Sequence, residues 1–455
     1  MSWERVDISR RKPHEEDGLS EEGRSLLEGE YSNMLSCISC GLCLTSCPTY
    51  VLSGNESEGP RGRIAMARAL AEGEMDLTED LIRHEQNCLV CDACTAVCPA
   101  GVSMDPIQVA LRTAMEPHLE ANRPLHQRGL RRLVFRRVFA SMPLFRLLVR
   151  SLGLYQRSGL QWAVRKSRIL NLLGLSETES LLPAGLPWSF LHPRGETYAA
   201  EKSAGADGRE TGFFAGCVMS TVFSDVDRAT IRVCQRAGWT VSATAGQGCC
   251  GALNAHGGDL EGMKELAKRN IEAFEAEGEA PVVVNSAGCG AMLKDYGHHF
   301  RDDPEWADRA HAFSERVKDV TELIQPQDLP FRRSIEDSVT YQEPCHLVHA
   351  QKISDKPRQL LRGIPGLELR EMNESSLCCG SAGVYNVTNP EESSQLQSRK
   401  LDNALATEAG TIVTANPGCH IQLQGGLEQR SGESGSPRVR HIVELLDEAT
   451  APKDL

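Results

Sequence analysis

The sequence lacks the features that mark several classes of protein. Its longest charge-free stretch, residues 31–55, is rich in Cys, Ser, Gly and Asn, so no transmembrane helix is expected in the 455 residues. The first residues have no apolar core of a signal peptide, so we do not expect a secreted, disulfide-stapled protein. Positive charge is also in deficit, and a formal net charge of −13 argues against nucleic-acid binding.

Cysteine, by contrast, is abundant. The chain has 17 cysteines, in an otherwise ordinary globular composition of 40% apolar and 24% charged residues. Its length predicts two to four domains. In a chain expected to be cytoplasmic, so many thiols indicate metal or redox chemistry. They fall into clusters of eight (37–98), five (217–289) and four (345–419).

The first cluster contains two copies of one motif. Both copies follow the spacing C-x₂-C-x₂-C-x₃-C-P, which is typical of bacterial ferredoxins, in which the fourth cysteine of each run ligates the other cluster. Zinc sites normally present cysteines in separated pairs, so iron–sulfur is the better interpretation. We therefore predict one [4Fe–4S] cluster held by Cys37, Cys40, Cys43 and Cys98, and a second held by Cys88, Cys91, Cys94 and Cys47.

The other two clusters are copies of each other. Cys217, Cys249, Cys250 and Cys289 are matched by Cys345, Cys378, Cys379 and Cys419, at offsets of 128, 129, 129 and 130 residues. Each adjacent pair is followed by glycine. The C-terminal half is therefore a tandem duplication of a unit of roughly 130 residues.

Apolar periodicity predicts the same α/β architecture for both repeats. Short apolar runs alternate with helix-period segments, which is typical of a mostly parallel sheet covered by helices. The first and last cysteine of each set follow a strand, at the carboxyl edge where α/β folds place their sites. The predicted strands are 211–215, 281–285, 339–342 and 411–415, and the predicted helices are 222–237, 260–277 and 391–408.

Adjacent cysteines on a regular strand would point to opposite faces, but in a glycine-rich loop both can turn toward one metal. We predict that each set of four thiols binds a metal centre, with an iron–sulfur cluster favoured over zinc, a vicinal redox disulfide or inert buried thiols. Cys234 has no counterpart in the second repeat and is predicted to be a small core residue.

Several histidines and arginines are candidates for a role at these centres. His256, His346, His349 and His420 lie beside the cysteines as candidate hydrogen-bond donors or proton carriers, with ordinary loop histidines as the alternative. A helix is predicted over 61–71, and its Arg61 and Arg63 either lie near the clusters or form a solvated first turn.

The segment between the first two cysteine clusters is basic. Residues 121–176 contain twelve Lys or Arg and no Asp or Glu, with apolar residues at helical spacing. Three interpretations stay open: helices lying on anionic lipid, docking onto an acidic partner, or a connector that packs on the protein's own domains.

Taken together, these motifs resemble the iron–sulfur subunit of glycolate oxidase. The phrases that carry the resemblance include CPTYVLSGNESEGPRGRI, QGCCGALNAHGGD, NSAGCGAMLKDYG, EPCHLVHAQ and CCGSAGVYN. The wider group includes the iron–sulfur subunits of anaerobic glycerol-3-phosphate dehydrogenase and of lactate-utilisation enzymes, and the Cys-Cys-Gly subunit of heterodisulfide reductase.

The resemblance implies an electron-transfer subunit of an oxidoreductase complex, with no catalytic residue of its own. A flavoprotein (FAD) partner would oxidise glycolate or another 2-hydroxy acid, and electrons would pass through the clusters to a quinone or another acceptor. The sequence agrees, because no G-x-G-x-x-G opens a helix. The implied location is cytoplasmic, with peripheral contact between 121–176 and the inner face of the membrane. A D-lactate, glycerol-3-phosphate or heterodisulfide-type complex is the alternative, and an iron–sulfur redox sensor or a zinc-stabilised scaffold is the non-enzyme alternative.

One departure from the group concerns cluster type. Members known for a non-cubane cluster carry a fifth cysteine three residues after the last one, where this chain has Met292 and Gln422. One or two further iron–sulfur clusters are therefore expected in the Cys-Cys-Gly domains, with their type open.

The predicted fold class is α+β and multidomain: a helical ferredoxin-type domain with two clusters, a basic helical linker, and two duplicated α/β Cys-Cys-Gly domains. The predicted boundaries are an acidic N-terminal tail (1–30), the ferredoxin domain (31–117), the linker (118–209), and the two α/β domains (210–330 and 338–449).

Overall fold

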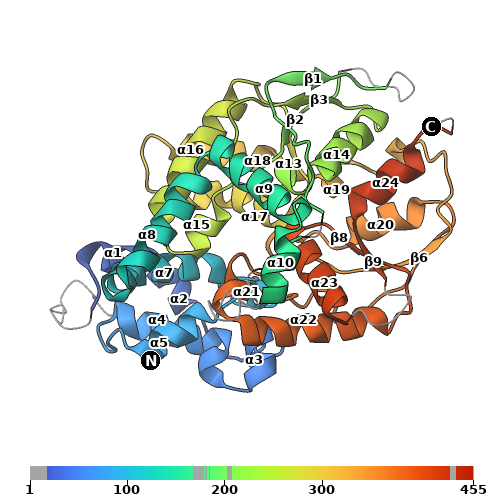
Figure 1. The fold of residues 1–455 in the computed structure, drawn as a ribbon. Coiled ribbons are helices and arrows are strands. Elements are labelled where there is room, and N and C mark those ends of the chain that lie inside the picture. The colour runs from blue at the N-terminus through green and yellow to red at the C-terminus, as the bar shows by residue number, and fades with distance from the viewer. Residues whose placement is uncertain are drawn as a thin grey trace. The chain divides into compact units, whose positions relative to one another are not determined.

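The computed structural model describes residues 18–167, 179, 182–183, 185–201, 208–430 and 437–453 (Figure 1). The chain divides into two compact units. The first comprises Met1–Arg131 with Leu253–Glu261, and the second comprises Arg132–Ala252 with Gly262–Leu455. The predicted fold class is confirmed, since a helical domain and a helical linker precede two α/β domains with parallel sheets.

The first unit is helical. Its longest packed helices present apolar residues at intervals of three and four, which buries one face of each. In α4 these residues include Ile64, Ala67 and Leu70, and they pack with Leu27 and Leu111 in one core. The elements are α1 (Glu21–Gly29), α2 (Tyr31–Leu35), α3 (Pro48–Ser53), the 3₁₀ turn η2 (Glu56–Glu58), α4 (Pro60–Ala71), α5 (Glu79–Gln86), α6 (Ala93–Ala96), α7 (Met104–Asn122) and α15 (Ala252–His256).

The helix predicted over 61–71 is therefore confirmed as α4, which begins at Pro60. Helix α1 lies inside the segment predicted as a tail, and it contacts α7. Its apolar residues are too few to stand out in the sequence against the surrounding charge. The domain boundaries themselves stay a prediction.

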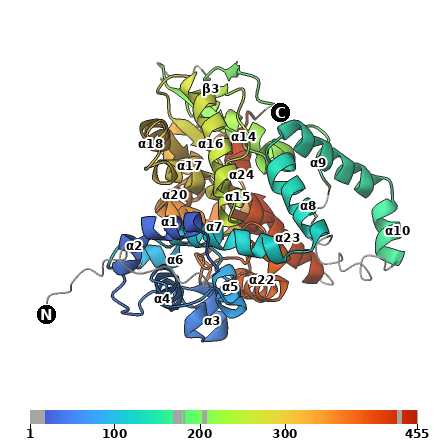
Figure 2. The same cartoon turned by 90° about the vertical axis from the view of Figure 1, so that its left-hand side faces the viewer.

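The linker forms a series of basic helices: α8 (Leu125–Leu133), the π-helical turn η3 (Val134–Val138), α9 (Met142–Arg157) and α10 (Leu160–Ser167). Figure 2 shows α9 and α10 as consecutive helices that meet at an angle. Helix α9 belongs to the second unit, and one of its faces packs there against the first α/β domain through Phe145 and Val149. Among the described residues no single helix is long and apolar enough to cross a membrane, although Leu125–Val138 and Met142–Arg157 pass that test as a pair bent by 114°.

The first α/β domain has a five-stranded sheet in the order β1-β3-β2-β4-β5. The three pairings that join β2–β5 are parallel, whereas β1 lies in the predicted linker segment and pairs antiparallel with β3. The strands are β1 (Glu196–Tyr198), β2 (Glu210–Phe214), β3 (Thr240–Ala243), β4 (Val282–Val284) and β5 (Val317–Asp319). The helices are α13 (Val218–Thr221), α14 (Ser224–Arg236), α16 (Leu260–Glu275), α17 (Ala287–His299), α18 (Ala307–Arg316) and α19 (Val320–Leu323), followed by the turn η4 (Pro326–Asp328).

The second α/β domain repeats this topology. Its sheet has the order β7-β6-β8-β9, all parallel, which matches β3-β2-β4-β5 strand for strand. The strands are β6 (Asp337–Tyr341), β7 (Leu367–Leu369), β8 (Thr411–Thr414) and β9 (Arg438–His441). The helices are the π-helical turn η5 (His346–Ala350), α20 (Asp355–Gly363), α21 (Tyr385–Thr388), α22 (Pro390–Leu405), α23 (Pro417–Arg430) and α24 (Ile442–Thr450).

Even the end of the last strand is duplicated. The last residue of β5 is Asp319, which is also the N-cap of α19 and forms a capping box with Glu322. Likewise, the last residue of β9 is His441, which is the N-cap of α24 and forms a capping box with Glu444. All the strands and helices predicted for the two repeats are found within a few residues of their expected positions. The duplication is therefore structural as well as sequential.

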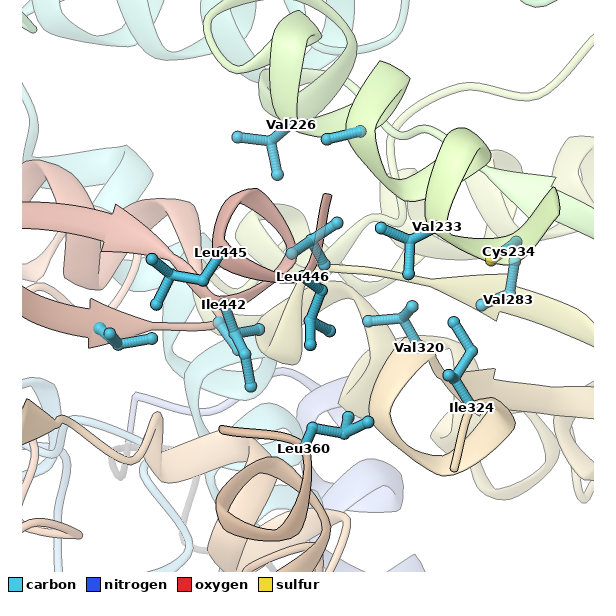
Figure 3. Packing of buried hydrophobic residues seen from close by; sticks show 14 of the residues in the cluster. Val226, Val233, Cys234, Val283, Val320, Ile324, Leu360, Ile442, Leu445 and Leu446 are labelled. Carbon is cyan, nitrogen blue, oxygen red and sulfur yellow. The ribbon is translucent and has the colours of Figure 1, made fainter. Parts of the chain in front are cut away.

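The two repeats share one hydrophobic core. Helices α14 and α24 lie side by side, and Val233 of α14 and Leu446 of α24 are both fully buried in the same cluster (Figure 3). The nearly buried Arg236 guanidinium adds a polar connection, because its Nη1 donates to Asp447 Oδ1 at 2.8 Å and to Thr450 Oγ1 at 3.0 Å. The repeats therefore depend on each other for burial.

We predict that Leu446→Ala lowers the free energy of unfolding of both α/β domains together, by about 2–5 kcal/mol, because it leaves a cavity in the shared core. Denaturant unfolding of the full chain, followed by circular dichroism, measures this change. Leu405→Ala is the control, since Leu405 is 38% exposed on α22. Two separate transitions, of which only one shifts, would contradict the shared core.

Candidate metal centres

The two ferredoxin motifs adopt the same unusual backbone. Ser39 and Val90 occupy equivalent positions with φ of 56° and 49°, and the next equivalent pair, Gly41 and Asp92, has φ of 80° and 58°. A β-branched residue such as Val90 rarely adopts this left-handed conformation, which costs of order 1–3 kcal/mol. The repeated strain curls each loop so that its cysteines can face a common centre.

The structure brings together the cysteines predicted for the first cluster. Cys37, Cys40, Cys43 and Cys98 line one pocket, so the last cysteine of the second motif lies with the first three of the first motif. Cys94, predicted for the second cluster, lines the same pocket. Apolar side chains including Ile64 complete the wall. This arrangement fits an iron–sulfur cluster, which needs four thiolates in a sheltered site, although the ligand set itself stays a prediction.

Three cysteines of the second predicted set lie near one another. Burial raises the pKa of the Cys94 thiol, and the neighbouring Cys88 and Cys47 of this set, together with Asp92 and with Cys43 of the first set, raise that pKa further. Cys91 is buried on the same loop. The Val90 backbone N–H donates to Cys88 Sγ at 3.4 Å, the kind of contact that stabilises thiolate sulfur.

Two arginines lie beside this second set. Arg63 is almost fully buried, with Nη1 3.9 Å from Cys47 Sγ and Nη2 donating to Glu58 Oε2 at 2.7 Å. Arg112 donates from Nη2 to the Cys88 carbonyl oxygen at 2.5 Å. Their positive charge favours the more negative, reduced state of a cluster held there.

Arg61, by contrast, lies near the first set and is partly exposed. It donates to the Ser39 carbonyl oxygen at 3.1 Å and pairs with Glu56. Of the two arginines singled out from the sequence, Arg63 is therefore the buried neighbour of a predicted ligand. Arg61 instead hydrogen-bonds the loop of the first ferredoxin motif at Ser39.

The Cys-Cys-Gly sets are assembled at the carboxyl edges of the two sheets. Cys217 caps α13 after β2, and Cys289 lies in the first turn of α17 after β4. Cys345 precedes η5 after β6, and Cys419 lies in the first turn of α23 after β8. The adjacent pairs 249–250 and 378–379 lie in loops that end in glycine.

Within each set the thiols interact in a chain. Hydrogen bonds from Cys217 and Cys250 lower the pKa of Cys249, and those from Cys378 and Cys419 lower the pKa of Cys379. Cys345 Sγ is 4.0 Å from Cys378 Sγ. Of these eight thiols all but the half-buried Cys289 are buried. Neighbouring thiols that share protons in this way fit a cation that displaces those protons, as thiolate-bound metals do.

Each of these loops requires its glycine. Gly251 and Gly380 have φ of 84° and 85°, so a side chain at either position would be strained. A Cβ on Gly251 would also lie 3.2 Å from the Met263 Cα, and one on Gly380 would lie 2.6 Å from the Ser393 carbonyl oxygen. The close approach of backbone to helix is what lets both cysteines of a pair face inward.

Where some related proteins have a fifth cysteine, this chain has Met292 and Gln422, and both side chains are buried. Gln422 Nε2 donates to Ser393 Oγ at 2.9 Å. Neither offers a thiolate. The cluster type at these two sets therefore stays open between cubane and non-cubane forms.

The two sets differ in one buried charge. Asn270 of the first repeat donates from Nδ2 to the Cys249 carbonyl oxygen at 2.9 Å, and the second repeat has Lys400 at this position of the helix. Lys400 is fully buried and donates to the Glu374 and Ser375 carbonyl oxygens. Burial lowers the pKa of Lys400, but all four thiols of the second set oppose that shift. Overlaying the repeats at an offset of 130 reveals this difference, which our reading of the sequence missed.

The singled-out histidines have different surroundings. His256 Nε2 lies 3.1 Å from Asp105 Oδ1, and His349 Nε2 lies 3.1 Å from the Ser376 carbonyl oxygen. His420 packs edge-on against Phe223 at 4.9 Å, and its buried Nδ1 has no hydrogen-bond partner among the described residues. Burial lowers the pKa of His420 to about 4. Cys234 is confirmed as a core residue, and burial raises its pKa to about 12.

Comparison with described families covers most of the chain. Residues 33–102 match the 4Fe-4S dicluster domain, and residues 211–294 and 339–424 match the cysteine-rich domain. Residues 126–182 match the linker region of the glycolate oxidase iron–sulfur subunit.

Curated relatives extend the similarity to nearly the full length. The chain is 41% identical over 432 residues to the probable glycolate oxidase iron–sulfur subunit of Bacillus subtilis, covering 94% of this chain and 95% of the relative. It is 32% identical over 423 residues to the glycolate oxidase iron–sulfur subunit of Escherichia coli, covering 92% and 94%. Lactate utilization protein A of Bacillus thuringiensis is 30% identical over 237 residues, covering 51% of this chain and 97% of that protein.

Among solved structures, a hypothetical protein from Helicobacter pylori has a similar fold. The TM-score is 0.50 at 8% sequence identity, with 95% of this chain and 77% of that chain covered. At this identity the likeness concerns the fold alone.

We predict that Lys400→Asn lowers the midpoint potential of one cluster by on the order of 50–100 mV, the equivalent of roughly 1–2 kcal/mol, because it removes a buried positive charge. Potentiometric titration followed by electron paramagnetic resonance measures the shift. Arg399→Gln is the control, since Arg399 carries the same charge one residue away but is partly exposed and pairs with Glu374. Equal shifts in both variants would show that burial of the charge does not matter.

Proposed function

The chain belongs to the glycolate oxidase iron–sulfur subunit family, and we propose that it carries electrons from a flavoprotein partner, which oxidises glycolate or a related 2-hydroxy acid, to a quinone or another acceptor. The feature that supports the proposal is the repeated spacing of the cysteines, from which we assign sixteen of the 17 to four sets of four. Bound iron–sulfur clusters would supply one-electron transfer at these sets.

The chain's own residues hold and tune the centres. The sixteen cysteines would be the ligands, and the curled loops and glycine turns would help to bring the four sulfur atoms of each set together. Arg63 and Arg112 would stabilise added negative charge at the second ferredoxin set, and Lys400 would do so at the second Cys-Cys-Gly set. No residue of this chain is assigned to substrate chemistry, which we place on the flavin partner.

Glycolate is favoured over the alternative substrates by two similarities. The linker region matches that of glycolate oxidase subunits, and the two relatives that this chain covers almost completely carry the same name. The lactate utilization relative matches only about half of this chain. A lactate or glycerol-3-phosphate complex therefore stays the second candidate.

We also propose that the linker contacts an anionic membrane surface from the cytoplasmic side. One face of α9 packs on the protein, but Leu147 and Leu154 on this helix are each 59% exposed, and Trp162 of α10 is 67% exposed. Lys166 lies over the Trp162 ring at 4.7 Å. Apolar side chains among basic residues, without acidic residues over 121–176, are typical of helices that lie at a lipid interface.

We predict that Cys40→Ser abolishes electron delivery from 2-hydroxy acid to an external acceptor, whereas reduction of the partner's flavin by substrate persists. Stopped-flow spectroscopy of the reconstituted complex separates the two steps. Cys234→Ala is the matched control, because Cys234 is a buried cysteine outside the four sets. Oxidation of the substrate by the isolated chain would contradict this function.

Metal analysis of the same anaerobically purified samples identifies the centres. About sixteen irons with equal acid-labile sulfide indicate four [4Fe–4S] clusters, and about eight indicate the ferredoxin pair alone. Zinc without sulfide would instead indicate the scaffold alternative. Normal clusters without any electron delivery would favour a redox sensor.

We predict that the chain binds vesicles of anionic phospholipid at low salt and is released at high salt, since charge attraction at a surface is screened. Replacing Leu154 and Trp162 together by Gln should weaken sedimentation with the vesicles at least tenfold. Leu405→Gln, on α22, is the control for loss of an exposed apolar side chain. Salt-independent absence of binding would exclude the membrane contact.

A further inference from the structure

A pocket of about 200 Å³ is lined by His420, the residue that follows Cys419 of the second Cys-Cys-Gly set. Three segments of the second unit form its wall: the end of the linker (182–183 and 185–187), the turn between α13 and α14 at Val222 and Phe223, and one side of α23 from His420 to Glu428. Most of the linker and turn side chains are apolar. His420, Gln424 and Glu428 supply polar groups along α23.

The pocket is one residue away from a predicted cluster ligand. His420 lines the pocket and directly follows Cys419, whose thiol hydrogen-bonds with Cys379. The Nδ1 atom of His420 is buried and has no partner among the described residues, while Phe223 holds the imidazole ring edge-on. His420 is thus a polar residue in the wall of an otherwise apolar site, where an imidazole N–H that reaches a ligand's carbonyl oxygen can donate to it.

The wall of the pocket is also fixed to the helix that we place at the membrane. Gln156 Nε2, near the end of α9, donates to the Pro183 carbonyl oxygen at 2.7 Å, and Gln156 Oε1 accepts from the Leu186 backbone N–H at 3.2 Å. Arg157 donates to the Leu186 carbonyl oxygen at 3.0 Å. Leu154, exposed on the same turn of α9, belongs to the proposed lipid-contacting face.

From these contacts we infer that the pocket binds the ring of a lipid-soluble quinone, and that electrons leave the protein at the second Cys-Cys-Gly set. A quinone takes up two electrons, one at a time, and two protons to form the quinol. The electrons come from the 2-hydroxy acid through the clusters, and the protons come from water at the exposed Glu428 side of the pocket. This inference rests on the proposed electron-transfer function and adds to it the acceptor's binding site.

The buried Lys400 supports the same exit point. Of the two otherwise matched sets, the one with the extra positive charge should hold an electron more readily. In that set, Cys419 directly precedes a residue of the pocket wall, His420. The corresponding side of the first repeat has neutral Asn270 in place of the lysine.

The test uses Gly425, which lines the pocket on α23. A Cβ added there meets no atom within 4 Å, so Gly425→Leu begins in open space and adds bulk to the pocket. Gln429→Leu adds the same side chain to an exposed position of the same helix outside the pocket and is the control. The reconstituted complex is assayed with glycolate and either decylubiquinone or ferricyanide, a water-soluble one-electron acceptor.

We expect Gly425→Leu to lower the ratio of quinone reduction to ferricyanide reduction at least tenfold, while Gln429→Leu behaves as the unmodified complex. Photolabelling of the unmodified complex with an azidoquinone provides a readout independent of folding in the variant. The label should lie on peptides from α23 or 182–187 and should be displaced by decylubiquinone. Displaceable labelling elsewhere, or an unchanged ratio in Gly425→Leu, would overturn the pocket assignment.

Failure of this inference and failure of the proposed function give different results. Ferricyanide reduction without any quinone reduction in the unmodified complex would overturn the quinone site and leave electron transfer standing. Reduction of neither acceptor, with the partner's flavin reduced by glycolate, would overturn both.

Discussion

The structure depends on one demand: four sulfur atoms must meet at one point, and at the two Cys-Cys-Gly sets this point is largely shielded from water. Burial opposes this demand, because desolvation disfavours the charged thiolate. Neighbouring thiols counteract this effect, because Cys249 and Cys379 each accept hydrogen bonds from two other thiols, which lowers their pKa. A positively charged metal centre would relieve the remaining cost, which couples the binding of the centre to the folding of the chain.

Two different backbone solutions meet that demand. In the ferredoxin motifs, left-handed residues such as Val90 curl a short loop until its cysteines face one way. In the α/β repeats, two cysteines come from the carboxyl ends of parallel strands and two come from a loop whose glycine lies against a helix. The first solution is local in sequence. The second solution needs a whole sheet in each repeat. The two repeats that carry these sheets are held together by one shared core, in which α14 contacts α24.

The parts of the fold that could be predicted were those with a regular sequence pattern. Cysteine spacing predicted the ferredoxin motifs, the offsets near 130 predicted the duplication, and short apolar runs predicted strands such as β4 and β8. Pairings between distant segments were not predictable in the same way. Strand β1 has three residues and joins its sheet only through β3, and α1 gains its position from contact with α7. Such elements are defined by tertiary contact, which a single sequence does not display.

At the sites, the cysteines were predictable but their surroundings were not. Arg112 is far in sequence from Cys88, and Lys400 lies on a helix that the apolar pattern alone would treat as an ordinary amphipathic element. Burying an ammonium group costs several kcal/mol unless negative charge compensates it. The compensation available to Lys400 is two backbone carbonyls and the four thiols of one set. Asn270 is neutral and needs no such compensation. Of the two repeats, only the second has a buried lysine that the thiolates around a bound metal would stabilise, and this lysine distinguishes two otherwise duplicated sites.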